Sequence, residues 1–376
     1  MQTSSRNPDK SGVIPLRCGA KFCGSFVKRG LSQFLLGEND MFGLSKNRSY
    51  AIGIDLGDDT VKIAQLGYNG KGINLIASGI ENRPVDVIPG SSNWQRWAIK
   101  AICELTANGK FQGRTVIAAI PASEVFIDHI KMPKIENKAT NVNKNTQNEN
   151  SLTKYLKWKP DSYDKLQQAV FSRIKGKLPF EPDDAMIKYI PTEQDNVLVI
   201  ATERKKIDRH LAIYEKADLQ IKSIAVWPTA LTNSYIQFFG RRKTDIEAVV
   251  MLLDIETNST NAVICRHKNL LFARSISIGT KQLDNKEIAA RLVLELTACR
   301  QLFASMHKKA QIERLIFLSG QTVNKDICTQ IAKQMEMPAQ IGDCLAAVEV
   351  EDLYGSGIDR RVCQVNWATA FGLSLS

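Results

Sequence analysis

The chain lacks the short motifs that identify most metal- and phosphate-dependent enzymes. Its eight cysteines form no CxxC pair, and its four histidines form no HExxH or other ligand spacing, so a zinc site is not expected. No GxxxxGK[ST] loop occurs, and no GxGxxG follows a strand-like run, so neither a P-loop nor a dinucleotide-binding turn is predicted. The scattered cysteines are typical of a reducing compartment, and we expect a cytoplasmic protein.

Long apolar segments are also missing. No run approaches the roughly 18 to 20 apolar residues that cross a bilayer, so we expect no transmembrane helix. No apolar stretch of about 7 to 15 residues near the N-terminus ends in a small-residue cleavage site, so secretion is not expected. Residues 1–47 are polar and basic apart from a short amphipathic patch, FVKRGLSQFLLG, and Met41 is an alternative start of the chain.

The positive charge of the chain is concentrated in two segments. Of the formal net charge of +11, residues 1–50 contribute +5 and residues 131–177 contribute +7, so the remaining residues are close to neutral. Nucleic-acid-binding faces usually combine basic residues with aromatic stacking partners on folded elements. We therefore expect no nucleic-acid partner, and the basic segments favour at most a weak attraction to an anionic membrane surface.

The apolar periodicity predicts an α/β protein, and 376 residues are enough for two or more domains. Strands are predicted at Ala51–Ile54, Val61–Gln65, Ile73–Ser78, Thr115–Ile120, Asp184–Ile190, Asn196–Thr202, around Asp254 and Val263, at Leu271–Ile278 and at Leu315–Leu318. Helices are predicted at Trp94–Ala107, Tyr163–Lys175, Lys205–Ala217, Asn285–Met306 and Gln364–Leu373. The Asn/Lys-rich segment Asn137–Ser151 has too few apolar residues to order itself, and a disordered insert is expected over about 137–157.

Two predicted hairpins carry an aspartate inside an apolar strand. YAIGIDLGDDTVKIAQL holds Asp55, and VVMLLDIETNSTNAVIC holds Asp254, 199 residues later. One such aspartate would usually cap a turn. Two copies in two α/β halves indicate facing domains that hold a metal–nucleotide phosphate group, with turn amides and hydroxyls on phosphate oxygens and the aspartates on hydrated Mg²⁺ or a water.

At these hairpins the sequence resembles the actin-like ATPases, and among them the type IV pilus assembly protein PilM family. GIDLGDDTVK resembles the first phosphate loop of the family, LLDIETNST the second, and FLSGQT the adenosine loop. VIAAIPASEVFIDHIKMP and KLPFEPDDAMIKYIP resemble the entry into a small subdomain that PilM shares with FtsA, and NWATAFGLSLS resembles the closing helix. The order and spacing of these motifs carry the resemblance from about Met41 to Ser376.

The resemblance implies a two-lobed actin-like α/β fold, a duplicated ribonuclease H-like fold, with an FtsA/PilM-type extra subdomain. The implied domains are a disordered basic tail at 1–47, a first lobe at 48–124, the extra subdomain at 125–223 and a second lobe at 224–376, of which about 224–246 and 360–376 return to the first lobe.

The resemblance also implies a site for ATP and Mg²⁺. The implied nucleotide-binding residues are Asp55, Gly57, Thr60, Lys62, Asp254, Thr257, Ser319 and Gly320, and Asp55 and Asp254 would hold Mg²⁺ through water. The sequence departs from the family at Asp58 and Asp59, where serines are usual, and at Glu256 and Gln321, where glycines are usual. Extra negative charge opposes polyphosphate binding, so two interpretations stay open: a working ATP site, and a retained fold with weakened or lost nucleotide binding.

By resemblance the protein is a cytoplasmic scaffold of type IV pilus assembly or a related secretion apparatus, peripheral to the inner membrane. It would bind ATP weakly or structurally, capture the N-terminal segment of a PilN-like inner-membrane protein, contact the pilus motor indirectly, and could form a homo-oligomer. Val125, Phe126 and Ile130 are the expected partner surface, although their alternation equally suits a half-buried strand. As a scaffold it would be at most a slow ATPase. The alternatives are an active actin-like ATPase or sugar-kinase-like phosphotransferase, and an FtsA-like filament-forming protein. No acid, base or nucleophile constellation is evident, so no catalytic residue is named.

Overall fold

The computed structural model describes residues 48–132, 160–320, 322–350 and 365–376. The chain divides into two units, Met1–Lys46 and Asn47–Ser376, and every described residue belongs to the second. The predicted tail with Met41, the Asn/Lys-rich insert, Gln321 and residues 360–364 lie outside the described residues.

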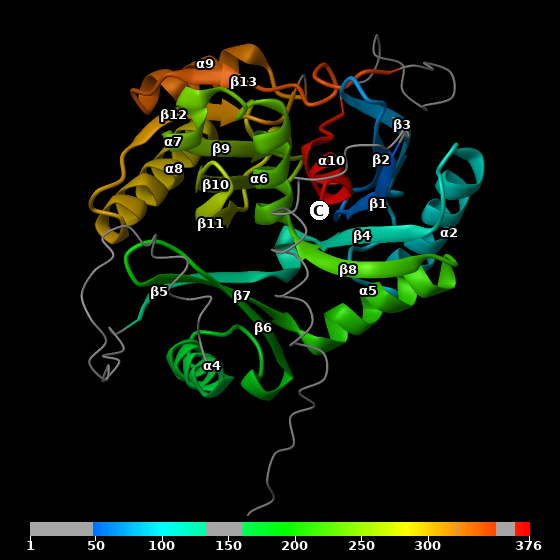
Figure 1. Cartoon of the computed structure of the whole chain (residues 1–376), viewed down its shortest axis with the longest axis horizontal. Coiled ribbons are helices and arrows are strands. Elements are labelled where there is room, and N and C mark those ends of the chain that lie inside the picture. Colours follow the sequence, from blue (N-terminus) through cyan, green and yellow to red (C-terminus); the bar gives the residue numbers. More distant parts are fainter. Residues whose placement is uncertain (1–47, 133–159, 321, 351–364) are drawn as a thin grey trace, which may run out of the picture. The chain divides into compact units, whose positions relative to one another are not determined.

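Two five-stranded sheets with the same strand order form the two lobes of this unit (Figure 1). In each sheet a three-stranded antiparallel meander is extended by two parallel strands beside its first strand. The first sheet has the order β3-β2-β1-β4-β8, formed by β1 (Arg48–Leu56), β2 (Thr60–Tyr68), β3 (Ile73–Asn82), β4 (Thr115–Ile120) and β8 (Gln220–Val226). The second has the order β11-β10-β9-β12-β13, formed by β9 (Val249–Ile255), β10 (Thr260–Arg266), β11 (Asn269–Ile276), β12 (Ile312–Phe317) and β13 (Ala339–Ile341). The two halves of the chain therefore repeat one topology.

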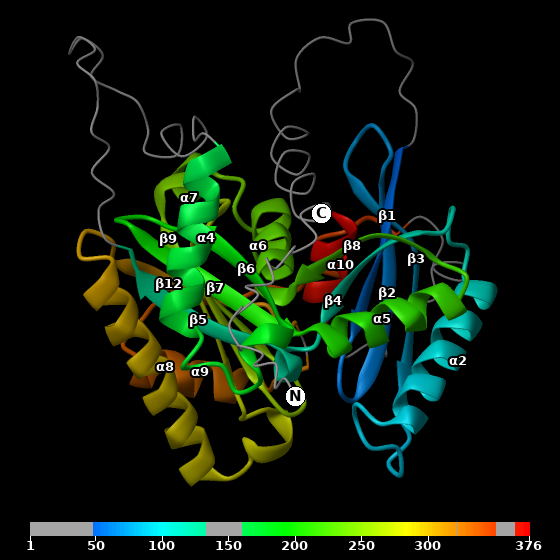
Figure 2. The same ribbon diagram turned by 90° about the horizontal axis from the view of Figure 1, so that it is seen from below.

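The first sheet packs against two helices, α2 (Ser92–Asn108) and α5 (Arg204–Lys216), which run beside it in Figure 2. Alternate residues of β1, Ile52 and Ile54, point to this side and pack with the fully buried Trp94 and Tyr214. The hydroxyl of Ser91 begins α2 by accepting a hydrogen bond from the Trp94 amide at 3.2 Å. Strand alternation and a helix cap thus fix the first lobe locally.

The second sheet is covered by α8 (Lys286–Met306) and α9 (Lys325–Gln334). Met251 and Leu253 of β9 pack with Leu296 and Phe303 of α8, all at most 1% exposed. The Asn285 side chain caps α8 by accepting from two backbone amides of its first turn. The predicted helix Asn285–Met306 is therefore confirmed, with Asn285 as its cap.

Two helices, α6 (Trp227–Phe238) and α10 (Ala368–Ser374), lie between the sheets and join the lobes (Figure 1). One hydrophobic cluster runs through them from β2 to β9. A Cβ atom added to Gly53 would lie 2.1 Å from the Ala370 oxygen, and one added to Gly372 would lie 1.8 Å from the Ala230 oxygen. Only glycine allows α10 to approach both β1 and α6 this closely.

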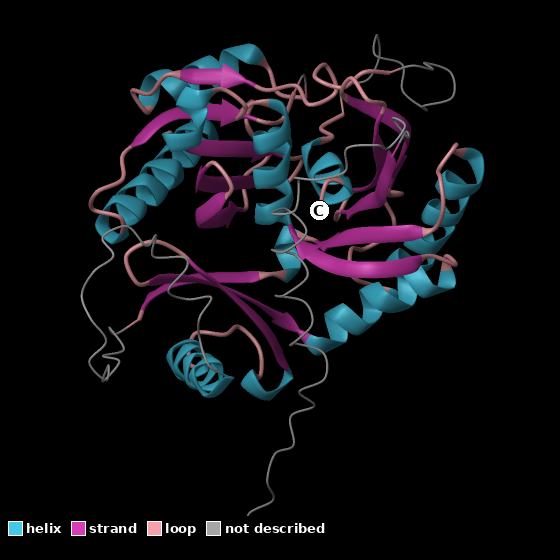
Figure 3. Cartoon of the chain, viewed as in Figure 1, coloured by secondary structure: helices cyan, strands magenta, loops and turns pink. Residues whose placement is uncertain are grey.

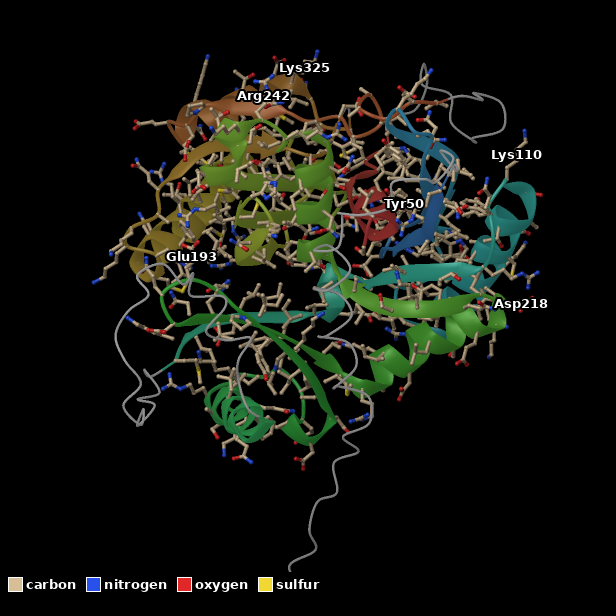
Figure 4. All side chains as sticks on the ribbon, in the orientation of Figure 1. Tyr50, Lys110, Glu193, Asp218, Arg242 and Lys325 are labelled. Atoms are coloured by element: carbon tan, nitrogen blue, oxygen red, sulfur yellow. The ribbon has the colours of Figure 1, made fainter. Side chains whose placement is uncertain are left out.

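A third, three-stranded sheet forms the small subdomain (Figure 3). Its antiparallel order is β5-β7-β6, from β5 (Phe126–Lys131), β6 (Ala185–Pro191) and β7 (Asn196–Glu203), with α4 (Pro160–Ile174) on one face. Leu166 and Val170 of α4 pack on Ile130 and Val199. Glu193, in the turn between β6 and β7 and labelled in Figure 4, forms an ion pair with Arg266 of β10.

Short connecting elements complete the described chain. They are the 3₁₀ turns η1 (Ala122–Glu124), η2 (Pro182–Asp184) and η3 (Thr280–Gln282) and the short helix α7 (Lys243–Glu247). None of the described helices is both long and apolar enough to cross a membrane.

The sequence predicted most of the strands and helices and missed elements of both kinds. The strand β8, the helices α6 and α9 and the three-residue strand β13 were not predicted. The predicted closing helix Gln364–Leu373 is observed as α10, which begins at Ala368. The predicted domain boundaries stay predictions.

Candidate functional site

Asp55 and Asp254 occupy equivalent positions in the two sheets. Each is the last residue but one of its central strand, β1 or β9. Across the hairpin, Asp55 pairs with Lys62 and Asp254 pairs with Asn261, in both cases seven residues later. The repeated topology therefore gives the two lobes matching hairpins, as the repeated aspartate predicted.

A single buried ammonium group joins the two hairpins. Lys62 Nζ lies 2.9 Å from Asp55 Oδ2 and 2.9 Å from Glu256 Oε1, and the lysine side chain is only 4% exposed. Burial lowers the pKa of Lys62, but the nearby carboxylates of Asp55, Glu256 and Asp254 outweigh it and raise the pKa above its usual range. Lys62 is therefore charged, and its charge is shared between the lobes.

Asp254 is fully buried and held from two directions. Asn261 Nδ2 donates to its Oδ2 at 3.1 Å, and Asn366 Nδ2 donates to its Oδ1. Burial, and next the negative charge of Glu256, raise the pKa of Asp254 to about 7, although Lys62 opposes the shift. Asn366 lies two residues before α10, so this contact fixes the closing helix to the second hairpin.

The first turn uses both of its extra aspartates as structural acceptors. Arg83 Nη2 donates to Asp59 Oδ1 at 2.7 Å, and Arg83 Nε donates to the backbone oxygen of Asp58 at 2.6 Å. The Ser123 hydroxyl donates to Asp58 Oδ1 at 3.0 Å. Burial raises the pKa of Asp58. These contacts fix the turn to the loop before α2 and to η1.

Asp59 also reaches the second lobe. Its Oδ2 accepts from Asn258 in the second turn and lies 3.5 Å from Lys281 Nζ. Lys281 is exposed, so this ion pair is weaker than the buried pairs of Lys62. It adds a second contact between the two hairpins.

The remaining predicted nucleotide residues of the turns have backbone roles. The Gly57 amide donates to the Thr60 oxygen at 2.9 Å and closes the first turn, and the Thr257 oxygen accepts from the Lys281 amide at 3.2 Å. A Cβ on Gly279 would lie 2.5 Å from the backbone of the second turn. Both turns are therefore fixed by their own backbone contacts.

In the predicted adenosine loop, the Ser319 side chain supports the second hairpin. Its hydroxyl accepts from the Ile255 amide at 2.7 Å, and the residue is 1% exposed. Gly320 follows with φ of +58°, a left-handed conformation that favours glycine. The structure thus brings Asp55, Lys62 and Asp254 together, whereas the Ser319 hydroxyl is engaged within the second lobe.

The three predicted partner residues do not share one exposed face. Val125 follows η1 and is half-buried against the central cluster, and Phe126 begins β5 and is also half-buried. Ile130 is 5% exposed and packs under α4. Ile130 is therefore a core residue of β5. Partner binding at Val125, Phe126 and Ile130 stays a prediction.

Three residues that hold the site together were missed from the sequence. Asn261 could have been found, because it follows Asp254 by the same seven residues that separate Asp55 from Lys62. Arg83 and Asn366 are brought in by other elements, and no local pattern marks them.

At the junction between the two hairpins, the polar side chains already pair with one another. Among residues 48–132, 160–320, 322–350 and 365–376, no three His, Cys, Asp or Glu side chains come together as metal ligands. Both oxygens of Asp254 accept from amides, and Glu256 occupies the side of Lys62 that faces the second turn. The residues in this arrangement therefore do not fit a polyphosphate bound to Lys62.

Comparison with known proteins identifies the fold. No protein-family model and no curated protein sequence matches the chain. Among solved structures, the chain is similar to one chain of a PilM–PilN type IV pilus biogenesis complex at 17% identity and a TM-score of 0.66, over 87% of this chain and 98% of that one. It is also similar to the ethanolamine utilization protein EutJ of Carboxydothermus hydrogenoformans (11% identity, 87% and 89% of the chains, TM-score 0.43). A third structure is the cytoplasmic domain of EpsL from the type II secretion system of Vibrio cholerae (11%, 73% and 82%, 0.41).

The first of these likenesses, together with the repeated sheet topology, confirms the predicted fold class. The chain has a two-lobed, duplicated actin-like α/β fold with an extra small subdomain of the PilM type.

Proposed function

We propose that the protein is a scaffold of type IV pilus assembly, or of a related secretion apparatus, that captures a short cytoplasmic segment of a PilN-like inner-membrane protein. The observation that carries the proposal is the likeness of fold, over 87% of the chain, to a chain of a PilM–PilN type IV pilus biogenesis complex. In this role the protein acts at the cytoplasmic side of the inner membrane and connects the membrane protein, indirectly, to the assembly motor.

The charged residues between the two hairpins support a structural role for this junction. Lys62 binds Asp55 and Glu256, and Asp59 binds Arg83. A group that activates water or carries a proton during catalysis must be able to change partners, whereas these groups satisfy each other. We therefore propose that ATP, with Mg²⁺, binds at most weakly or structurally and is not turned over rapidly.

The partner surface we propose is the start of β5. In the described part of the third sheet β5 is an edge strand, and an extended peptide can add to an edge through main-chain hydrogen bonds while apolar side chains anchor it. Val125 and Phe126 are half-buried there and can supply an apolar anchor site. Ile130, in the core, supports the strand from the side of α4.

Peptide binding with a matched pair of variants tests this function. A labelled peptide with the N-terminal segment of the PilN-like protein is titrated with the full chain, and its anisotropy is followed. Phe126→Ser should weaken binding about tenfold, because an apolar contact of roughly 1.4 kcal/mol is lost. Met186→Ser is the control, because Met186 is an apolar residue, 37% exposed, on the opposite edge strand β6.

The outcomes separate the function from its surface. If the wild-type chain does not bind the peptide, the proposed function is wrong. If it binds, and Met186→Ser rather than Phe126→Ser weakens binding, the function stands and the peptide lies on β6. Urea unfolding of both variants shows whether either has lost its fold.

A further inference from the structure

Glu256 projects into the junction from a turn that is fixed on both sides. Its amide donates to the Ser259 oxygen at 2.8 Å, and its own backbone oxygen accepts from the Thr280 amide at 2.9 Å. Its Oε1 atom lies 2.9 Å from Lys62 Nζ and accepts from Asn366 Nδ2 at 3.4 Å. The carboxylate is therefore held in place by contacts from the first hairpin and from the segment before α10.

This carboxylate takes the position on Lys62 that an anionic ligand between the hairpins would need. A buried ammonium is stable only when it is paired, and Lys62 gains half of its pairing from the other lobe. A phosphate oxygen could bind Lys62 from the second-lobe side only after Glu256 had moved away.

The charge at the junction also disfavours a second anion. One ammonium, Lys62, faces the two carboxylates of Asp55 and Glu256 directly. A polyphosphate would add negative charge where carboxylates already outnumber cations, and like charges a few ångströms apart repel strongly outside bulk water. Neutralising Glu256 removes one of these charges and frees one side of Lys62.

We propose that Glu256 is a built-in substitute for a nucleotide phosphate. Its carboxylate binds Lys62, keeps the two hairpins joined without a nucleotide, and competes with MgATP for the same ammonium group. Glu256 thereby lowers the affinity of the junction between the hairpins for polyphosphates. This inference goes beyond the scaffold function and does not depend on the partner peptide, because it concerns the junction of the lobes alone.

The test measures MgATP binding to the full chain by calorimetric titration. The wild-type protein should bind MgATP only in the millimolar range. Glu256→Gln, which keeps the size of the side chain and removes its charge, should bind at least about tenfold more tightly. Glu256→Gly should give the same gain without the side chain, so the test does not rest on one variant. The unfolding temperature of each protein, with and without MgATP, gives a second readout.

Glu193→Gln is the matched control. The Glu193 side chain is 29% exposed and that of Glu256 is 28% exposed. Each carboxylate pairs with a basic residue on another sheet than its own. The partner of Glu193 is Arg266, which lies away from the two hairpin turns. This variant should lose stability without any gain in MgATP affinity. The proposal is overturned if neither Glu256 variant binds MgATP more tightly than wild type, if Glu193→Gln gains as much, or if wild type already binds in the micromolar range. Peptide capture is measured separately, so its failure and the failure of this proposal are distinguishable.

Discussion

Replacing Lys62 by methionine should destabilise the protein more than the loss of an ordinary surface ion pair. Methionine keeps most of the volume of the lysine stem and removes the ammonium, so Asp55 and Glu256 lose the cation that lies 2.9 Å from each of them. Breaking a buried ion pair by removing one partner typically costs about 3–5 kcal/mol. Because the Asp55 and Glu256 side chains are 16% and 28% exposed, water screens part of this effect, and we expect about 3 kcal/mol in the free energy of unfolding.

The cost of this substitution should depend on pH with a definite sign. Burial and Glu256 already raise the pKa of Asp254, and Lys62 opposes that shift, so Lys62→Met raises the pKa of Asp254 further. Both folded proteins hold a proton that the unfolded chain releases above about pH 4, but the wild type releases it at about pH 7 and the variant only at a higher pH. Its free energy of unfolding therefore falls as the pH rises from about 4, and the deficit against wild type is larger at about pH 8 than at about pH 5.

Urea unfolding of the full chain, followed by tryptophan fluorescence and circular dichroism, measures both effects. A loss of about 3 kcal/mol shifts the midpoint by roughly 1 M when the urea dependence is about 3 kcal/mol per M. The double variant Lys62→Met/Glu256→Gln should recover part of the loss, because it leaves one carboxylate fewer without a cation. A Lys62→Met protein with the wild-type midpoint at about pH 8 would refute the reasoning, since the ammonium would then contribute nothing to joining the hairpins.

Two further predictions concern the packing between the lobes and the subdomain. Gly372→Ala should lower the free energy of unfolding in urea by more than about 3 kcal/mol, because its Cβ would lie 1.8 Å from the Ala230 oxygen. The control is Gly176→Ala, whose Cβ would have nothing within 4 Å and which should stay within about 0.5 kcal/mol of wild type. Equal urea midpoints for the two variants would contradict the close approach at Gly372. His129 Nε2 accepts from the Ala273 amide at 3.2 Å. Burial lowers the pKa of His129 from 6.5 to about 4. The contribution of neutral His129 to the free energy of unfolding is therefore complete above about pH 6.5 and is lost as the pH falls toward 4. His129→Gln should remove up to about 3 kcal/mol of this pH dependence. If the free energy of unfolding changes by the same amount between about pH 7 and pH 4.5 in the variant and in wild type, His129 does not titrate with unfolding.

The hairpins could be predicted from the sequence because their signals are local. The apolar run before Asp55 and the apolar run after the turn are neighbours in the chain, and the same pattern recurs at Asp254. The observed strand β1 extends past the predicted Ala51–Ile54 on both sides. The extra residues belong to the strand because β1 pairs with β2 there, and their own hydrophobicity did not predict this.

The missed elements are those whose stability comes from distant partners. The sequence of β8, QIKSIAV, has a lysine and a serine inside it, and it becomes a strand because β4 offers a parallel edge. The three residues of β13 are all exposed and depend on β12. The contact between Lys62 and Glu256 joins residues 194 positions apart, so it could be found only in the folded protein.

The acidic departures from the family pattern have one physical consequence in common. Asp58 accepts from Ser123, Asp59 from Arg83, and Glu256 from Lys62, so each carboxylate meets a donor from another element. The negative charge of these carboxylates repels a phosphate, but it attracts hydrogen-bond donors on other elements and so links those elements together. A nucleotide site needs Lys62 available to the ligand, whereas two hairpins joined without a ligand need it paired, and one ammonium group cannot meet both demands at once. The residues present meet the second demand, and this arrangement would suit the proposed scaffold function, in which the lobes stay joined while a partner binds elsewhere.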